Sequence, residues 1–374
     1  MKKVWIGLLI VVLIALFGGR AWYSYTQRET EKPNEKVIKI GAILPLSSNM
    51  AKTGKEILES LKIAENNINN DPQYSFKVKI IVEDGKHQAR ASLDAFHKLI
   101  AQKIDTMIVF SDEATAPLVR FINDNKMQTL VIGGRPFGPY TFTVPVSNET
   151  LLYAYGKYVA NKMHLKRIGI IYLDSVSGKQ TTDAFIKGAT EKGSEITSIE
   201  KYKDGAMETK TQVLKALDKD PDALFVFGWG DNSFPATINY IRELGYKKPI
   251  LSHFVIPSAL PYLKDKSNIH FVDLTLQPAH DTYGYAAAYR QKFDGADPDM
   301  MATFNYIAAH MIANVANKVG TENPELFMKE VKTLPSFETP YGQMKIIDEK
   351  TYLPMFAKKI LPDGTIEVIE EIKE

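Results

Sequence analysis

Short apolar runs alternate with amphipathic segments along most of the chain. The runs 36–44 and 106–110 are apolar enough to be buried strands, whereas 54–69 and 87–102 repeat their apolar residues at helical spacing. A strand in a parallel sheet is covered on both faces, which explains runs that are apolar throughout. The alternation continues to residue 145 and predicts a parallel sheet wrapped by helices.

A second series of the same kind begins at residue 167 and continues to residue 252. A strand predicted over 268–274 and long helices over 284–293 and 301–319 are expected to return the chain to the first lobe. A length of 374 residues also suits two domains better than one core. We therefore predict an α/β protein with two doubly wound parallel-sheet lobes joined by a hinge of crossover strands. The expected boundaries are 37–145 for lobe 1, completed by about 276–345, and 146–275 for lobe 2, completed by about 346–374.

Residues 1–25 have the order of charges and apolar residues that directs export. Lys2 and Lys3 precede an apolar run over 4–19, and an aromatic cluster follows the run. The lysines place the N-terminus inside and the body of the protein outside the cytoplasm. The run is long for a signal-peptide core and short for a full span, so two alternatives remain. One is an uncleaved membrane anchor, which the aromatic cluster favours; the other is a signal cleaved near the small-x-small sequence at 19–21.

The polar segment 26–36 is predicted to be a linker between this N-terminal segment and the globular body. We therefore expect an extracytoplasmic protein, in the periplasm or at the cell surface, attached to the cytoplasmic membrane by its N-terminal helix. Composition supports a globular body, since 45% of the residues are hydrophobic and 24% are charged.

Composition also excludes several classes of function. A formal net charge of +2, with no basic arm or acidic tail, gives no argument for nucleic acid as a partner. The absence of cysteine excludes disulfides, thiolate catalysis, cysteine metal sites and a lipid-modified cysteine. The seven histidines show no metal-binding pair, and neither the Gly-x-Ser-x-Gly nor the Gly-x-x-x-x-Gly-Lys motif occurs. We therefore predict a protein that is not an enzyme and that uses no cofactor or metal.

Several short motifs occur in a fixed order along the chain. The segment 40–48 reads Ile-Gly-Ala-Ile-Leu-Pro-Leu-Ser-Ser, and Gly54 and an Asn-rich helix end at 64–69 follow it. Further matching segments are 111–117, 140–147, 166–172, 221–228 and 242–245. In these segments the chain resembles the branched-chain amino-acid binding proteins of ABC transporters, which have the periplasmic-binding-protein type I fold. The likeness extends over roughly 36–369.

The resemblance implies a protein that captures a small polar molecule or an amino-acid-like ligand in the cleft between its lobes and delivers it to an ABC permease. An alternative is a membrane-anchored sensor or interaction module that partners a membrane receptor instead, because a fold does not fix a role. The predicted anchor and the missing lipid-modified cysteine favour this alternative.

Ligands of open α/β sheets bind outside the carboxyl ends of the strands, so the loops that follow strands are candidate ligand loops. By resemblance, Ser47 and Ser48 lie in the first loop of lobe 1, Asp112 and Glu113 in the second, and Arg135 in the third. The serines could instead form a turn or helix cap, and Asp112 could be a helix N-cap. Arg135 is expected to bind an anionic group or to neutralise Asp112, or else to be a solvated or structural arginine.

Four further candidates come from the rest of the chain. Ser177 stands where the family often has a tyrosine, and Trp229 could stack on a ligand. Asp231 could accept hydrogen bonds, and Tyr306 matches an aromatic residue that the family carries on a helix. Each of the last three could equally be a core or capping residue.

The candidate site differs from that of the family at two positions that would bind the charged groups of an amino acid. Phe254 stands where the family commonly has an acid for the ligand ammonium group, and Asp112 stands near the position that binds the ligand carboxylate. An ammonium or carboxylate that loses water without gaining a partner costs several kcal/mol. We therefore expect leucine, isoleucine and valine to be poor ligands, and the identity of the ligand remains open.

Overall fold

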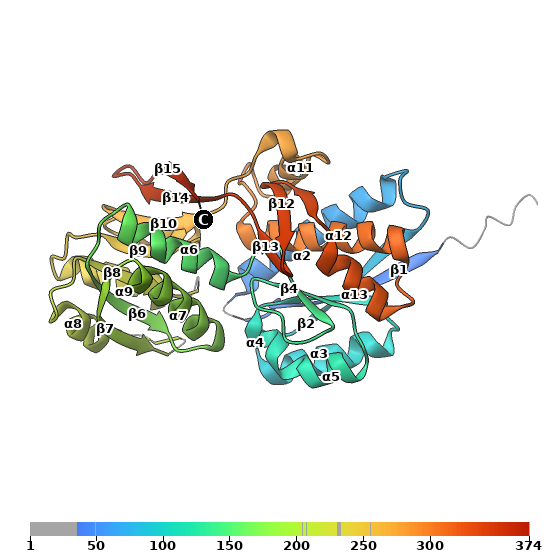
Figure 1. Cartoon of the computed structure of the whole chain (residues 1–374), viewed down its shortest axis with the longest axis horizontal. Helices are drawn as coiled ribbons and strands as arrows, with labels where there is room; N and C mark the ends of the chain where they lie inside the picture. Colours follow the sequence, from blue (N-terminus) through green and yellow to red (C-terminus); the bar gives the residue numbers. More distant parts are fainter. Residues whose placement is uncertain are drawn as a thin grey trace, which may run out of the picture.

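The computed structural model describes residues 36–48, 50–203, 205–206, 208–229, 233–254 and 256–373, which form two lobes (Figure 1). Lobe 1 is built on a five-stranded sheet in the order β2-β1-β3-β4-β5, in which every pair is parallel. Its strands are β1 (Val37–Leu44), β2 (Lys77–Asp84), β3 (Thr106–Phe110), β4 (Thr129–Ile132) and β5 (Thr141–Val144).

Helices cover both faces of the lobe 1 sheet. On one face, α2 (Ala51–Asn70) and α12 (Met300–Val319) bury side chains such as Ile57 and Leu61 against Ile40 and Ile108. On the other face, α3 (Ala89–Ala101) and α5 (Val119–Asp124) pack against Ile43. Neighbouring residues of one strand therefore belong to two cores, which is the reason the strands are apolar throughout. The lobe also contains α4 (Asp112–Thr115), η1 (Ala116–Leu118), α11 (Tyr285–Lys292) and α13 (Pro324–Thr333).

Lobe 2 is built on a seven-stranded sheet in the order β15-β14-β10-β9-β8-β6-β7. Strands β6 to β10 pair in parallel, whereas β14 pairs antiparallel with β10 and β15. The strands are β6 (Arg167–Leu173), β7 (Glu195–Tyr202), β8 (Ala223–Phe227), β9 (Ile250–His253), β10 (Ile269–Asp273), β14 (Met355–Ile360) and β15 (Ile366–Ile372). The helices are α6 (Asn148–Asn161), α7 (Val176–Glu191), α8 (Lys210–Leu217), α9 (Ser233–Glu243), α10 (Ile256–Ala259) and η2 (Leu260–Tyr262).

The chain crosses between the lobes after β5, after β10 and before β14 (Figure 1). The second crossover includes η3 (Pro278–His280), and a small sheet of β11 (Ser336–Thr339), β12 (Gly342–Ile347) and β13 (Lys350–Tyr352) precedes the third. Gln277 joins two of these segments: its main-chain N–H donates to Pro340 O at 2.8 Å, and its side-chain amide donates to Tyr341 O at 2.9 Å. We call 275–283 and 336–341 the hinge segments.

The predicted fold class is confirmed, and some predicted elements need correction. The segment 116–125, part of the predicted alternation, is η1 followed by α5 rather than one helix, since Pro117 has no N–H to donate at the start of η1; α4 precedes it. In the second series, helix α7 begins at Val176, where Ser175 caps it by accepting the N–H of Gly178 at 3.0 Å. Helix α13 and strands β11 and β13 were not predicted. The expected N-terminal anchor lies outside the described residues, and no helix within the described ranges is long and apolar enough to cross a membrane.

Candidate ligand-binding cleft

A cavity of about 450 Å³ lies between the two lobes, beside the hinge segments. Met50 and Thr53 line it from lobe 1, and Trp229, Phe254 and Pro257 line it from lobe 2. The remaining lining residues belong to the hinge and to neighbouring elements, namely Asp273, Leu274, Thr275, Leu276, Pro278, Arg290, Asp297, Pro298, Asp299, Met300, Met301, Tyr341, Lys358 and Ile366. Its size falls in the range of small-molecule sites. We call this space the cleft cavity.

Trp229 forms an aromatic wall of the cleft cavity. Its ring centroid lies 5.5 Å from that of Phe227, 6.0 Å from His253 and 6.2 Å from Phe254. The indole Nε1 is buried and has no hydrogen-bond partner among the described residues. His253 beneath it is fully buried, and burial lowers its pKa to about 3, so the ring is neutral. Trp229 therefore rests on an uncharged aromatic base.

The charges that line the cleft cavity are largely paired. Arg290 Nε donates to Asp297 Oδ1 at 2.7 Å, and Lys358 Nζ lies 2.9 Å from Asp273 Oδ2. Both basic side chains that line the cavity in the described part of the chain are thus already engaged with a carboxylate. A ligand carboxylate would have to compete with Asp297 or Asp273 for its partner.

Asp299 is the carboxylate of the cleft cavity that has no basic partner within the described ion pairs. It caps α12 by accepting the N–H of Ala302 at 2.6 Å, and burial raises its pKa. Glu56 lies beside it, and burial followed by the charge of Asp299 raises the pKa of Glu56 to about 7. Both carboxyl groups therefore bind a proton more readily than exposed carboxyl groups do. Asp299 can accept a hydrogen bond from a donor group in the cavity.

Glu113 connects the two lobes directly. Its Oε1 accepts the main-chain N–H of Ser177 at 3.0 Å and the hydroxyl of the same residue at 2.5 Å. Ser177 lies in the first turn of α7, where free N–H groups and the helix dipole favour a negative charge. A carboxylate of the protein thus occupies an anion-binding position on lobe 2.

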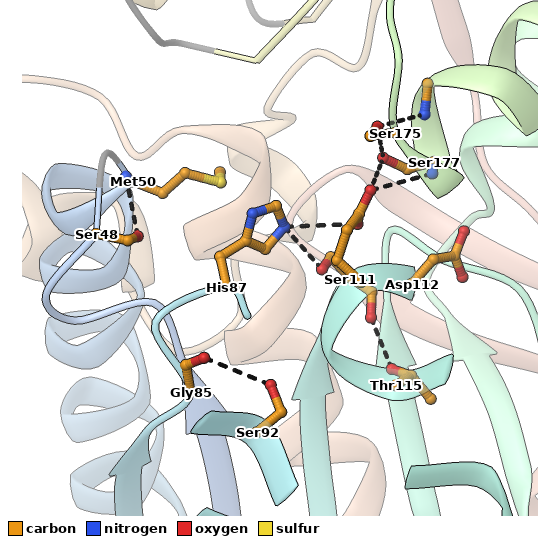
Figure 2. A network of polar contacts seen from close by, with 12 residues as sticks. Ser48, Met50, Gly85, His87, Ser92, Ser111, Asp112, Thr115, Ser175 and Ser177 are labelled. Atoms are coloured by element: carbon orange, nitrogen blue, oxygen red, sulfur yellow. Dashed lines mark hydrogen bonds and ion pairs between the residues drawn. The ribbon is translucent and has the colours of Figure 1, made fainter. Parts of the chain in front are cut away.

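His87 lies between the first loop, which carries Ser48 and Met50, and the second loop, which carries Ser111 (Figure 2). Its Nε2 is 3.0 Å from the Ser111 hydroxyl and 3.5 Å from Glu113 Oε2. Burial raises the pKa of Glu113, but the hydrogen bond and charge of His87 and the bonds from Ser177 outweigh it and lower the pKa to about 2. Glu113 is therefore ionised at neutral pH.

Asp112 and Arg135 contact each other, and both also contact Gln180 of lobe 2. Asp112 Oδ1 accepts the main-chain N–H of Arg135 at 2.9 Å; with the Gln180 amide oriented so that both its nitrogen and its oxygen find partners, the nitrogen donates to Asp112 Oδ2 at 2.9 Å. The Gln180 amide oxygen accepts from Arg135 Nε at 3.0 Å and Nη2 at 2.9 Å. Burial raises the pKa of Asp112 to about 7, although the Arg135 N–H opposes the shift. Gly134 permits this approach, since a Cβ there would lie 2.4 Å from Asp112 Oδ1.

Arg135 is directed away from the cleft cavity. Its guanidinium lies 5.0 Å from the centre of the Phe137 ring and lines a separate cavity of about 800 Å³ with Tyr153, Lys187 and Lys350. Asp112 points away from His87 in Figure 2. Both residues therefore hold the lobes together through Gln180, and the structure gives neither of them a place in the cleft cavity.

The serines of the first loop bond to nearby protein groups. The Ser47 hydroxyl donates to the Asp84 carboxylate, and the Ser48 hydroxyl accepts the main-chain N–H of Met50 at 3.1 Å. These bonds match the turn that the sequence left as an alternative. The serines shape the loop, and Met50 is the described residue after these serines that lines the cleft cavity.

Tyr306, a further candidate, is not brought to the cleft cavity. Tyr306 is buried in lobe 1, where its ring stacks on Tyr285 at 4.1 Å and its hydroxyl accepts from Asn67 Nδ2 at 3.1 Å. It lines a different cavity. Asp231 lies outside the described residues.

Sequence reasoning did not select His87, Gln180, Met301 or Asp299. His87 follows the end of β2, so the rule that placed the other loops at the cleft could have found it. Gln180 lies one turn after Ser177 on the same face of α7. In the sequence, Asp299 has the pattern of a helix N-cap, and this pattern does not indicate that a cavity lies beside it.

Residues 37–357 match the family model described as periplasmic binding protein, and the chain belongs to this family of extracytoplasmic solute-binding proteins. No curated protein sequence matches the chain.

Solved structures with the same fold include three relevant relatives. A leucine-binding protein from Thermotoga maritima is 16% identical, with a TM-score of 0.78 over 90% of this chain and 99% of the other. A branched-chain amino-acid transporter substrate-binding protein from Streptococcus pneumoniae, in complex with isoleucine, is 21% identical, with a TM-score of 0.77 over 91% and 100%. An ABC transporter solute-binding protein from Rhodopseudomonas palustris, in complex with 3,4-dihydroxybenzoic acid, is 19% identical, with a TM-score of 0.77 over 91% and 99%.

Proposed function

We propose that the protein captures a small solute in the cleft cavity and delivers it to an ABC permease. The observation that carries the proposal is the cavity itself, which both lobes line beside the hinge segments. A solute in this position contacts both lobes and therefore favours their closure. The relatives named above, which include transporter components, support delivery to a permease over the alternative of a sensor.

The proposed solute is largely apolar or aromatic, carries a hydrogen-bond donor and has no carboxylate. Trp229, Phe254, Met50 and Met301 supply the apolar contacts. Asp299 supplies an acceptor for the donor group. The paired state of Arg290 and Lys358 argues against a carboxylate.

Glu113 excludes an anion from one further position between the lobes, the N-terminus of α7, which lies outside the lining of the cleft cavity. It already occupies the N-terminus of α7 and remains ionised at neutral pH. A second carboxylate at this place would displace Glu113 and lose its bonds to Ser177, and like charges would repel. The Glu113 carboxylate therefore occupies a position at which the N-terminus of a helix could otherwise bind a ligand anion.

Trp229 allows a direct test. The chain has three tryptophans, and a protein that begins at Glu31 retains Trp229 but not Trp5 or Trp22. A screen of amino acids, amides, aromatic acids, polyols, nucleobases and aromatic amines should yield a solute that changes the Trp229 emission and raises the melting temperature. The Trp229→Phe variant should keep weaker binding and lose the emission change. A solute that stabilises the protein but leaves the emission of Trp229 unchanged would contradict the cleft cavity as its site.

We also propose that the N-terminal run stays attached and tethers the body to the membrane. The support is the sequence alone: a run over 4–19 followed by an aromatic cluster that suits a membrane interface.

A further inference from the structure

A second cavity, of about 300 Å³, lies within lobe 1 against the hinge segments. Tyr74, Tyr306 and His310 line it from the buried side, and Tyr283 and Glu338 line it from the exposed side. It shares no lining residue with the cleft cavity. The proposed function makes no use of this second cavity, which we call the aromatic cavity.

Aromatic rings form much of the aromatic cavity. The His310 ring is in contact with two tyrosines, 4.6 Å from the Tyr283 centroid and 4.5 Å from that of Tyr306. Tyr74 and Phe337 add two more rings to the lining. Clustered aromatic rings attract cations through their negative faces, and such cages are the usual means of binding quaternary ammonium groups.

The charges around the aromatic cavity are acidic. Asp281 and Glu338 line it, and Asp71 accepts a hydrogen bond from the Tyr283 hydroxyl at 2.8 Å. Lysine and arginine are absent from its described lining residues. The imidazole of His280 lies at the rim, with Nδ1 2.9 Å from Glu338 Oε2. This distribution favours a positive ligand and disfavours an anion.

His310 adds a polar atom that the fold leaves without a partner. The residue is only 4% exposed, and its Nε2 has no hydrogen-bond partner among the described residues. Burial lowers its pKa to about 4, so it does not oppose a cation at neutral pH. A buried polar group without a partner is costly, and the residue that carries this atom lines the aromatic cavity.

We propose that the aromatic cavity is a second binding site, which takes a small organic ammonium ion. Tyr283, Tyr306 and Phe337 provide the aromatic surroundings, and Glu338 and Asp281 provide the opposite charge. The cavity is large enough for a small ligand.

Isothermal titration of the full-length protein with choline tests the site. The matched control ligand is 3,3-dimethylbutan-1-ol, which has the shape of choline without its charge. We expect choline to bind and the neutral alcohol to bind about tenfold more weakly, since it gains neither cation–π nor charge attraction. Added salt should weaken choline binding further.

Two substitutions at one position separate the ring from the hydroxyl. Tyr283→Phe and Tyr283→Leu both lose the bond to Asp71, but only the second loses the aromatic ring. We expect Tyr283→Leu to weaken choline binding at least about threefold more than Tyr283→Phe does. Glu338→Gln should weaken it about twofold, because it removes one opposite charge at the exposed rim.

Trp229→Phe is the control for the cleft cavity and should leave choline binding unchanged. Three results would each overturn the proposal: no choline binding at millimolar concentration, equal binding of the neutral alcohol, or loss of choline binding in Trp229→Phe but not in Tyr283→Leu. Because the control residue and the tested residues lie in separate cavities, the outcome does not depend on the cleft solute.

Discussion

The carboxylate of Glu113 in lobe 1 accepts the main-chain N–H of Ser177 in lobe 2 at 3.0 Å. Charge-assisted bonds of this kind are stronger than neutral ones, and this one spans the division between the lobes. Gln180 provides a second connection one turn further along α7. These polar contacts help to fix the relative position of the lobes.

Glu113→Gln should shift the lobes towards a more open arrangement. The amide keeps the shape of the side chain but loses its charge, so the bonds to Ser177 and His87 weaken; we expect a change of about 1–3 kcal/mol in the free energy of closure. Small-angle scattering of the ligand-free protein should show a larger radius of gyration. Ser177→Ala keeps the main-chain N–H and should have a smaller effect. An unchanged radius in Glu113→Gln would show that Glu113 does not hold the lobes together.

The raised pKa of Asp112 should make the free energy of unfolding decrease as the pH rises. Its pKa is raised from 3.8 to about 7, so the folded protein binds more protons than the unfolded chain between these values. Its contribution to the free energy of unfolding is then complete below 3.8 and lost as the pH rises through about 7. We expect Asp112→Asn to remove on the order of 2–4 kcal/mol of this pH dependence, measured by urea unfolding across the range.

Glu56 titrates in the same range, so its variant is needed as a comparison. Burial, followed by the charge of Asp299, raises the pKa of Glu56 to about 7, and the sign of its effect is the same as that of Asp112. Glu56→Gln should remove a separate part of the dependence of the free energy of unfolding on pH. If Asp112→Asn leaves the slope intact, Asp112 is not held protonated by its burial.

Leucine, isoleucine and valine should give no thermal stabilisation. Among the described residues that line the cleft cavity, the basic partners for their carboxylate are Arg290 and Lys358, and both are paired. Left without partners, charged groups of the ligand lose several kcal/mol of solvation. A true ligand at about a hundred times its dissociation constant adds roughly 2.7 kcal/mol of stability, which a thermal-shift assay detects readily. A clear shift with leucine would instead support the usual ligand of the related amino-acid binding proteins.

Trp229→Ala and Tyr306→Ala should have different effects. Trp229 lines the cleft cavity, so its loss should weaken binding of the cleft solute by about 1–3 kcal/mol. Tyr306 is buried in lobe 1, so its loss should lower the free energy of unfolding by about 3–5 kcal/mol. Urea unfolding and solute titration of both variants would distinguish these effects. Tyr306→Phe preserves the core. If this variant bound the cleft solute much more weakly, Tyr306 would have to belong to the cleft site.

The N-terminal run should remain in the mature protein. Intact-mass measurement of protein extracted from the membrane fraction should give the uncleaved mass. A mature protein that begins at Trp22, after the small-x-small sequence, would show that the run is a cleaved signal.

The hydrophobic pattern was sufficient to predict the α/β class, both lobes and most strands. Burial of a strand or of one helix face is a local property, visible in the order of residues such as Ile40, Ile43 and Ile108. Boundaries were less certain where a single group decides them. The Ser175 side chain caps α7 at Val176, and Pro117 interrupts the helical segment after β3.

The candidate site could be predicted only as a set of loops. Trp229 and Glu113 follow strands, and the positions of strand ends place them between the lobes. Which partner each side chain meets depends on the distance between segments far apart in sequence. The sequence determined that carboxylates, an arginine and an indole would lie near the junction of the lobes. Only the tertiary structure decided that Glu113 binds Ser177, that Arg135 turns to Gln180, and that Tyr306 packs on Tyr285, because such contacts depend on packing across the whole fold.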